Sequence, residues 1–266
     1  MAALNVTPDS FSDGGQFTSV DAAVARARQM EDEGADMIDI GGESTRPGAE
    51  PVSGEEELRR TLPVIEKLAG RVKVPLSIDT IKPAVARAAV KAGVSVINDI
   101  AGNRTDLAMW EIVAETKAGY VLTHLQGTPQ TMRENPTCRD VAAEVDEFFG
   151  ARLQQLAACG VSSEQVALDV GIGFGKGLEH NLQLLGQLRR FKRWGRPLVL
   201  GASRKSFMGR LLGAKLEERL GPSLACACWA AEQGVQIIRC HDVAATRLAL
   251  RMTEALLERQ KNAEHH

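Results

Sequence analysis

Short apolar runs with β-strand character alternate with amphipathic segments along the whole chain. The apolar runs cover residues 2–4, 37–40, 74–78, 94–97, 120–122, 166–168, 198–200 and 235–238. The clearest amphipathic segments, with apolar residues at helical spacing, are 20–33, 55–68, 84–91 and 141–158. Strands that alternate with helices are typical of a parallel sheet wrapped by helices. The pattern therefore predicts an α/β protein.

Turn-forming residues indicate where these helices begin and end. Pro83 suits a first helical turn, and the left-handed position after a helix suits Gly34, Gly70, Gly93 and Gly160. One helix per strand, repeated through about 250 residues, predicts a (β/α)8 TIM barrel. The alternative, an open doubly wound sheet, normally uses about five or six strands. No linker divides the chain, so we expect one barrel domain over residues 1–259 and a disordered tail or tag remnant at 260–266.

The residues that follow the apolar runs are the first candidates for chemistry. They open the connections and are Asn5, Gly41, Asp79, Asn98, His124, Asp169, Ser203 and Arg239. In a TIM barrel the carboxyl ends of the strands form one active face. We therefore expect these residues, distant in sequence, to converge around one mouth.

Composition and charge exclude several classes of partner. The chain is 44% hydrophobic and 25% charged, and 32 basic residues nearly balance 34 acidic ones. A net charge of −2 supplies neither the basic surface that nucleic acid needs nor a field that attracts membranes. No apolar run approaches the roughly 18 residues of a membrane span, and the chain starts without the features of a signal peptide. We expect a cytoplasmic protein.

Three connections at the predicted mouth stand out. Residues 5–15 and 41–48 form long loops rich in turn formers, which at a barrel mouth commonly serve as lids; the alternative is a series of Asx and Ser turns. The third, 171–176, reads Gly-Ile-Gly-Phe-Gly-Lys. It fails the P-loop and dinucleotide patterns in its spacing. What remains is a loop in which every second residue lacks a β-carbon, which lets a flat ligand or neighbouring residues approach its backbone.

Residues 5–15 and 41–48 resemble the two signature loops of the dihydropteroate synthase family. The resemblance continues, in one order and over essentially the whole chain, through residues 77–80, 98–100, 126–129, 169–176, 203–207 and 239–243. It implies a transferase of folate biosynthesis that condenses 6-hydroxymethyl-7,8-dihydropterin pyrophosphate with p-aminobenzoate and releases pyrophosphate. It also implies a homodimer through the late helices.

The chemistry of a pterin ring fits several residues at the predicted mouth. A buried carboxylate can accept two parallel hydrogen bonds from the guanidine-like edge of the ring. The resemblance assigns this role to Asp169, with Asp79 and Asn98 at the remaining ring nitrogens and Lys205 at the ring carbonyl. A helix N-cap is the alternative for Asp79.

A pyrophosphate site is implied at the junction of the first and last strands, which are neighbours in a closed barrel. Arg239 would supply a planar fork, His241 a second donor, and Asn5 an oxygen ligand for Mg²⁺. Thr45 belongs to the same site by resemblance. A hydrogen-bonded seam between the two strands is the alternative for His241.

A p-aminobenzoate pocket is implied beside the pterin. Phe174, Lys205 and Ser206 would form it on the scaffold, and the loops would complete it with Phe11, Asp13, Thr45, Arg46 and Pro47. The weak nucleophilicity of an arylamine favours a dissociative, SN1-like path. Asp79, Lys205, Arg239 and His241 are the expected catalytic residues.

Three positions depart from the usual family pattern, namely Leu125, Cys138 and Val170. None removes a polar group from the implied site, and His124 can be either a core residue or a site residue. Two other interpretations stay open. A pterin-binding methyltransferase of the corrinoid type would share Asp79, Asn98 and Asp169, and a non-catalytic pterin-binding module would tolerate loss of Arg46, Arg239 or Lys205.

Overall fold

The computed structural model describes residues 1–7, 16–44, 50–102, 107–127 and 140–264. Within these ranges eight parallel strands form one sheet in the order β1 to β8. The strands are β1 (Ala2–Asn5), β2 (Ile38–Gly41), β3 (Leu76–Asp79), β4 (Val96–Asp99), β5 (Gly119–Thr123), β6 (Val166–Asp169), β7 (Leu198–Leu200) and β8 (Ile237–Ile238). Ala2 pairs with Cys240 just beyond β8, so the last strand meets the first. The predicted barrel is confirmed, and the open doubly wound sheet is excluded.

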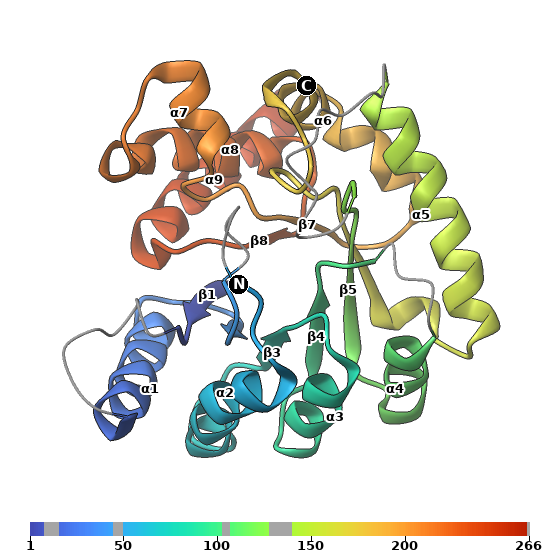
Figure 1. Ribbon diagram of the computed structural model, residues 1–266. Helices are drawn as coiled ribbons and strands as arrows, with labels where there is room; N and C mark the ends of the chain where they lie inside the picture. Colours follow the sequence, from blue (N-terminus) through green and yellow to red (C-terminus); the bar gives the residue numbers. More distant parts are fainter. Residues whose placement is uncertain (8–15, 45–49, 103–106, 128–139, 265–266) are drawn as a thin grey trace.

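Helices surround this barrel (Figure 1). They are α1 (Gln16–Asp32), α2 (Gly54–Leu68), α3 (Pro83–Lys91), α4 (Ala108–Thr116), α5 (Val141–Ala158), α6 (Leu178–Gly186), α7 (Ser206–Leu212), α8 (Leu220–Glu232) and α9 (Val243–Glu264). The described ranges also contain the short 3-10 helices η2 (Ser163–Gln165), η3 (Leu188–Trp194) and η4 (Leu216–Arg219). Helix α9 continues to Glu264, past residue 259, the predicted end of the barrel domain. None of the described helices has the length and apolar character needed to cross a membrane.

Two predicted strands, those that become β4 and β8, begin too early because their first residues cap helices. The apolar runs predict strand at Val94 and Val235, yet the N–H groups of these residues donate to Ala89 and Ala230 at 3.1 and 2.9 Å. Each valine follows a left-handed glycine after a helix, which is the Schellman arrangement. The apolar residue after that glycine therefore packs on the helix it ends, and the strand begins later. The four glycines predicted at such positions all have positive φ, as expected.

At their carboxyl ends, most strands extend further than predicted. Asn5, Gly41, Asp79 and Asp169 are the last residues of their strands rather than the first of the connections. Side chains alternate between the two faces of a strand. Ile38, Ile40 and Ile78 accordingly join the apolar core against the helices, while polar residues of the same strands face the barrel interior. The site residues thus stand on the rigid part of the fold.

Candidate active site

One row of residues crosses four neighbouring strands at their carboxyl ends. Strand register pairs Asn5 with Gly41, Gly41 with Asp79, and Asp79 with Asn98. An added Cβ on Gly41 would lie 3.7 Å from Asn5 Oδ1 and 3.7 Å from Asp79 Oδ2. The glycine therefore leaves open the space between these two oxygens. The convergence expected from the sequence is present for this part of the mouth.

Arg239 crosses the barrel interior from the end of β8 to this row. Its Nε donates to Asp39 Oδ2 at 2.7 Å, and its Nη2 donates to Asp79 Oδ2 at 2.8 Å. Asn98 Nδ2 donates to the same Asp39 oxygen at 2.9 Å. Asp39 is fully buried, and among the described residues its Oδ1 has no hydrogen-bond partner. One guanidinium thus holds two buried carboxylates from neighbouring strands.

Burial and charge act against each other in this cluster. Burial raises the pKa of Asp79 to about 7, while Arg239 draws it down. Burial disfavours the charged form of Arg239, but Asp39 and Asp79 outweigh burial and keep the pKa of Arg239 above its ordinary value. The site therefore holds a permanent cation beside a carboxyl group that titrates near neutrality.

Asp169 occupies the opposite part of the mouth, at the end of β6. It is 6% exposed, and its Oδ1 accepts the N–H of Gly171 at 2.8 Å. Burial raises the pKa of Asp169, and Lys205 is the main opposing charge. A Cβ on Gly201 would lie 3.8 Å from Asp169 Oδ2 and 3.9 Å from Arg239 Cβ. Gly201 thus keeps side-chain atoms out of the space between Asp169 and Arg239.

Lys205 lies against the glycine loop, which is residues 171–177. Its ammonium is 4.3 Å from the centre of the Phe174 ring and donates to the carbonyl of Ile172. Burial lowers the pKa of Lys205 to about 8, with Asp169 as the largest opposing charge. The neighbouring Ser206 begins α7 and is exposed. Lys205, rather than Ser206, is therefore the residue of this turn that reaches toward Asp169.

The glycine loop packs against the segment after β5. A Cβ on Gly171 would be 1.9 Å from the carbonyl oxygen of His124, and one on Gly175 would be 2.1 Å from that of Gln126. The missing β-carbons therefore admit neighbouring backbone, which was one of the two explanations open from the sequence. Lys176 donates to the carbonyls of His124, Gly171 and Phe174 at 3.1, 2.9 and 3.1 Å.

The side chain of His124 is packed as a core residue. It is 3% exposed, stacks edge-on against Phe148, and has Nε2 3.4 Å from a Glu144 carboxylate oxygen. Burial lowers the pKa of His124 to about 4. Its imidazole is therefore neutral near pH 7, and its backbone carbonyl is what contacts the glycine loop.

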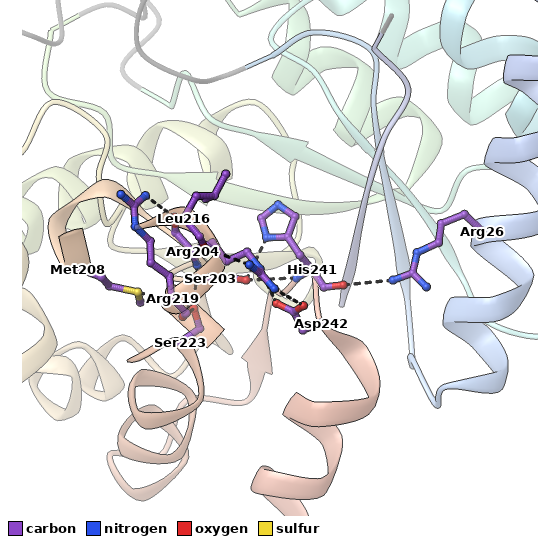
Figure 2. Close-up of polar contacts among 9 residues, drawn as sticks. All are labelled: Arg26, Ser203, Arg204, Met208, Leu216, Arg219, Ser223, His241 and Asp242. Atoms are coloured by element: carbon purple, nitrogen blue, oxygen red, sulfur yellow. Dashed lines mark hydrogen bonds and ion pairs between the residues drawn. The ribbon is translucent and has the colours of Figure 1, made fainter. Parts of the chain in front are cut away.

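His241 lies beyond β8 and is held by the loop after β7. Ser203 Oγ lies 2.9 Å from His241 Nδ1 and accepts the His241 N–H at 3.3 Å. Figure 2 shows this corner, where the next residue of each pair, Arg204 and Asp242, also meet. Arg239, two residues before His241, instead turns to Asp39 and Asp79. Arg239 and His241, predicted to share the diphosphate, are thus anchored by different partners.

Several predicted site residues lie outside the described residues: Phe11, Asp13, Thr45, Arg46 and Pro47. The stem of the second loop is described and is anchored. Lys82 donates to Glu57 at 2.6 Å and also to Glu43, and Arg60 donates to the carbonyl of Gly42 at 3.0 Å. Glu57 is fully buried, so this ion pair fixes where the loop leaves the barrel.

Known proteins resemble this chain over nearly its full length. A family model described as pterin binding enzyme matches residues 1–241. The dihydropteroate synthase of Escherichia coli (strain K12) is 49% identical, with 100% of this chain and 94% of the relative covered. A Yersinia pestis dihydropteroate synthase solved with a sulfonamide drug has TM-score 0.91 at 45% identity, covering 97% of this chain and 94% of that one. A Xanthomonas albilineans dihydropteroate synthase with 4-aminobenzoic acid has TM-score 0.90 at 45% identity, covering 97% and 92%. The chain belongs to the dihydropteroate synthase family.

Sequence reasoning missed two residues of this dihydropteroate synthase fold. Asp39 lies within a predicted apolar run. A lone carboxylate inside a buried strand needs a partner, so its position in the sequence was a signal of a buried ion pair. In the sequence, Lys176 served only to exclude nucleotide-binding patterns. Its neighbouring residues contain no signal that its side chain is buried. Both lie within the barrel mouth, directly behind the residues that the sequence did identify.

Proposed function

We propose that this chain catalyses the dihydropteroate synthase reaction, condensing 6-hydroxymethyl-7,8-dihydropterin pyrophosphate with p-aminobenzoate to give 7,8-dihydropteroate and pyrophosphate. The observation that carries the proposal is the set of buried and half-buried polar side chains at one barrel mouth: Asp79, Asn98, Asp169, Lys205 and Arg239. Charges withdrawn from water are costly unless they are paired or serve a ligand. A flat heterocycle with donors on one edge and a carbonyl on another complements this set.

The pterin ring would lie between the strand row and the glycine loop. Asp169, with one oxygen already on Gly171, offers its other oxygen to the ring edge. Asp79 and Asn98 would meet the remaining ring nitrogens, and Lys205 would donate to the ring carbonyl. Family membership supports this arrangement, and the burial of Asp169 and Asn98 supports recognition by hydrogen bonds in a site that excludes water.

The diphosphate would lie toward Asn5, Arg239 and His241, with Thr45 from the second loop. Arg239 uses Nε and Nη2 for carboxylates, and in the part of the chain that the structure describes its Nη1 has no hydrogen-bond partner. That donor is free for a phosphate oxygen. As the C–O bond breaks, Arg239 and His241 would stabilise the charge that develops on the leaving diphosphate. An arylamine is a weak nucleophile, so this dissociative path needs no strong base.

Mg²⁺ fits the donor set only as an ion that comes with the diphosphate. The described residues contain no group of three or more His, Cys, Asp or Glu side chains placed to hold a metal. Asn5 supplies one amide oxygen, and Mg²⁺ is commonly bound by one or two protein ligands together with phosphate and water. When bound, the ion neutralises phosphate charge.

The p-aminobenzoate pocket would form next to Phe174, Lys205 and Ser206. Phe174 is a residue of the glycine loop, where its N–H donates to the carbonyl of Gly171 at 3.0 Å, and its ring already contacts Lys205. Phe11, Asp13, Arg46 and Pro47 would complete the pocket from the two loops. The Xanthomonas relative solved with 4-aminobenzoic acid supports p-aminobenzoate as the second substrate.

We also propose that the chain forms a homodimer through its late helices, in the cytoplasm. Leu248, Met252 and Leu256 lie one turn apart on α9 and are 69%, 60% and 59% exposed. Trp229 of α8 is 41% exposed. An apolar stripe of this kind fits burial against a second copy. Sedimentation of the wild type and of Met252→Glu tests it, and a monomeric wild type would refute it.

Pyrophosphate release on mixing the protein with the pterin pyrophosphate, Mg²⁺ and p-aminobenzoate tests the function. We expect turnover that requires all three, and weakening of pterin affinity by ~2 kcal/mol or more in Asp169→Asn, because an amide donor would face ring N–H groups. Pterin binding without turnover would instead favour a non-catalytic pterin-binding module. Methyl transfer to a corrinoid acceptor would favour the methyltransferase.

A further inference from the structure

Arg204 has a backbone conformation that arginine rarely adopts. Its φ is +56°, and the other described non-glycine residue with positive φ, Lys117, caps the end of α4. Arg204 ends no helix. It lies between β7 and α7, two residues before α7 begins. A left-handed non-glycine residue that does not close the C-terminal end of a helix is strained and persists only when its surroundings hold it, which points to a role.

The surroundings hold the Arg204 backbone on both sides (Figure 2). Its N–H donates to Ser223 Oγ at 2.8 Å, and its carbonyl accepts Arg219 Nη1 at 3.2 Å. Ser223 Oγ in turn donates to the carbonyl of Arg219 at 2.6 Å. Residues of η4 and α8 thus hold the backbone of this turn. Because the backbone is held, the direction of the Arg204 side chain is also restrained.

The guanidinium reaches the turn after β8. Nε and Nη2 donate to the two carboxylate oxygens of Asp242 at 2.8 and 2.7 Å, and Nη1 donates to the carbonyl of Leu216 at 3.1 Å. This two-pronged geometry restrains orientation as well as distance, which a lysine could not do. Each of the three guanidinium nitrogens is therefore engaged.

The ion pair joins two short segments that carry site residues. Ser203 precedes Arg204, and His241 precedes Asp242, and these two flanking residues also contact each other through Ser203 Oγ. From the other side, Arg26 of α1 donates to the carbonyl oxygen of His241 at 3.4 Å. Lys205, by contrast, is tethered separately by Phe174 and the carbonyl of Ile172. The restraint therefore acts on His241 far more than on Lys205.

We infer that Arg204, through its forked ion pair with Asp242, is a positioning residue that holds His241 against Ser203 in the orientation that meets the diphosphate. The inference rests on the proposed function. It predicts a selective defect: ligands that contain diphosphate should lose affinity when the pair is broken, and the pterin ring alone should not. A residue with a purely structural role would affect both ligands or neither.

The test uses Arg204→Asn, Asp242→Asn and the double variant, with Arg210→Gln as control. Asn tolerates the left-handed conformation, so Arg204→Asn keeps the turn and removes the fork. Arg210 is an exposed arginine of the adjoining α7. Inorganic pyrophosphate with Mg²⁺, and separately 6-hydroxymethylpterin, are titrated into each protein by calorimetry. Thermal unfolding is recorded in parallel.

We expect both single variants to weaken pyrophosphate binding at least about tenfold, with pterin binding within about twofold of wild type. The double variant should be no worse than either single variant, because the two residues act as one device. In turnover, kcat should fall while KM for p-aminobenzoate stays unchanged. If Arg204→Asn unfolds, Asp242→Asn alone carries the test, because it leaves the turn intact.

Asp242→Asn also separates positioning from direct contact. If Arg204 bound the diphosphate itself, removing its carboxylate partner would free the guanidinium and would leave pyrophosphate affinity unchanged or stronger. That result would overturn the inference, as would equal losses for pterin and pyrophosphate. A wild type that binds both ligands without turnover would refute the proposed function, and the binding comparison would still decide the role of Arg204.

Discussion

Two regions of the barrel mouth hold a cation behind the site in different ways. In the glycine loop, Lys176 is 7% exposed and donates to three backbone carbonyls. At the corner between β7 and β8, Arg204 is half-buried and pairs with a carboxylate. Burial lowers the pKa of Lys176 to about 7, whereas the hydrogen bond to Asp242 raises the pKa of Arg204. One region therefore contains a cation that titrates near neutrality, and the other a cation that does not.

Different interactions stabilise the two regions. Neutral carbonyls compensate a buried charge poorly, so the glycine loop is held mainly by close backbone packing that admits no side chain. At the corner, the charges of Arg204 and Asp242 neutralise each other, and both side chains are partly exposed to water. This ion pair therefore restrains the orientation of the two side chains more than it stabilises the fold. Substitutions in and around the two regions should separate backbone packing from side-chain orientation.

Gly171→Ala should be the most damaging change. Its φ is +72°, and its new Cβ would lie 1.9 Å from the carbonyl oxygen of His124. We expect it to lower the free energy of unfolding by at least ~4 kcal/mol, or to prevent folding, because backbone would have to move. Gly70→Ala is the matched control, since φ is +71° with nothing within 4 Å. It should cost only ~1 kcal/mol in urea unfolding. Equal losses in the two variants would show that packing of the loop is not the reason.

Lys176→Met should change the pH dependence of stability. Burial lowers the pKa of Lys176 from 10.5 in the unfolded chain to about 7 in the folded protein, so folding favours the neutral amine. The stability that comes from this preference is complete above the unfolded pKa and is lost as the pH falls through the folded pKa. Between about pH 7 and pH 9, the wild type should gain up to ~1.4 kcal/mol per pH unit relative to Lys176→Met. Urea unfolding at several pH values measures this. Parallel curves for the two proteins would contradict the expected depressed pKa, and no such slope should arise from Arg204.

Lys205 should impose an alkaline limb on activity. Burial lowers its pKa to about 8, so the ammonium that would bind the ring carbonyl is lost as pH rises above that value. We expect kcat/KM for the pterin pyrophosphate to fall about tenfold per pH unit in that range. Lys205→Arg, with a group that stays charged, should lower the plateau and remove the limb. The same limb in both proteins would assign it to another group.

Asp242→Asn should have the smallest effect on stability. The side chains of Arg204 and Asp242 are 27% and 26% exposed, so water compensates much of the loss. We expect the free energy of unfolding to fall by ~1 kcal/mol or less. Urea unfolding beside Lys176→Met gives the comparison directly. A loss of several kcal/mol would mean that the corner supports the fold itself.

The sequence was informative where a local rule determined the structure. Helix α5 begins and ends as predicted, and Pro83 opens α3, because periodicity and capping act over a few residues. The row of Asn5, Asp79 and Asn98 was also expected, since parallel strands bring their carboxyl ends to one face. The predicted strands begin too early at Val94 and Val235 because apolar character alone does not separate a strand residue from a helix cap.

Local rules such as periodicity and capping did not predict which residues pair with the charged side chains of the site. Arg204, Lys205 and Ser206 are adjacent in sequence but point to Asp242, to the glycine loop and to solvent. That outcome depends on a strained φ at Arg204, which η4 and α8 impose from elsewhere in the chain. Asp39 likewise became a partner of Arg239 only when closure of the barrel placed β2 and β8 on either side of β1.

Local sterics and periodicity make the eight-fold alternation of strand and helix, the glycines that end the helices and the residue types at the mouth readable from the amino-acid sequence alone. Three features arise from the folded chain: Asp39 and Asp79 share Arg239, Lys176 is a buried cation, and His241 is braced through Ser203, Arg204 and Asp242. Electrostatic compensation in a buried site depends on distances between residues far apart in the chain, and closure of the barrel sets those distances.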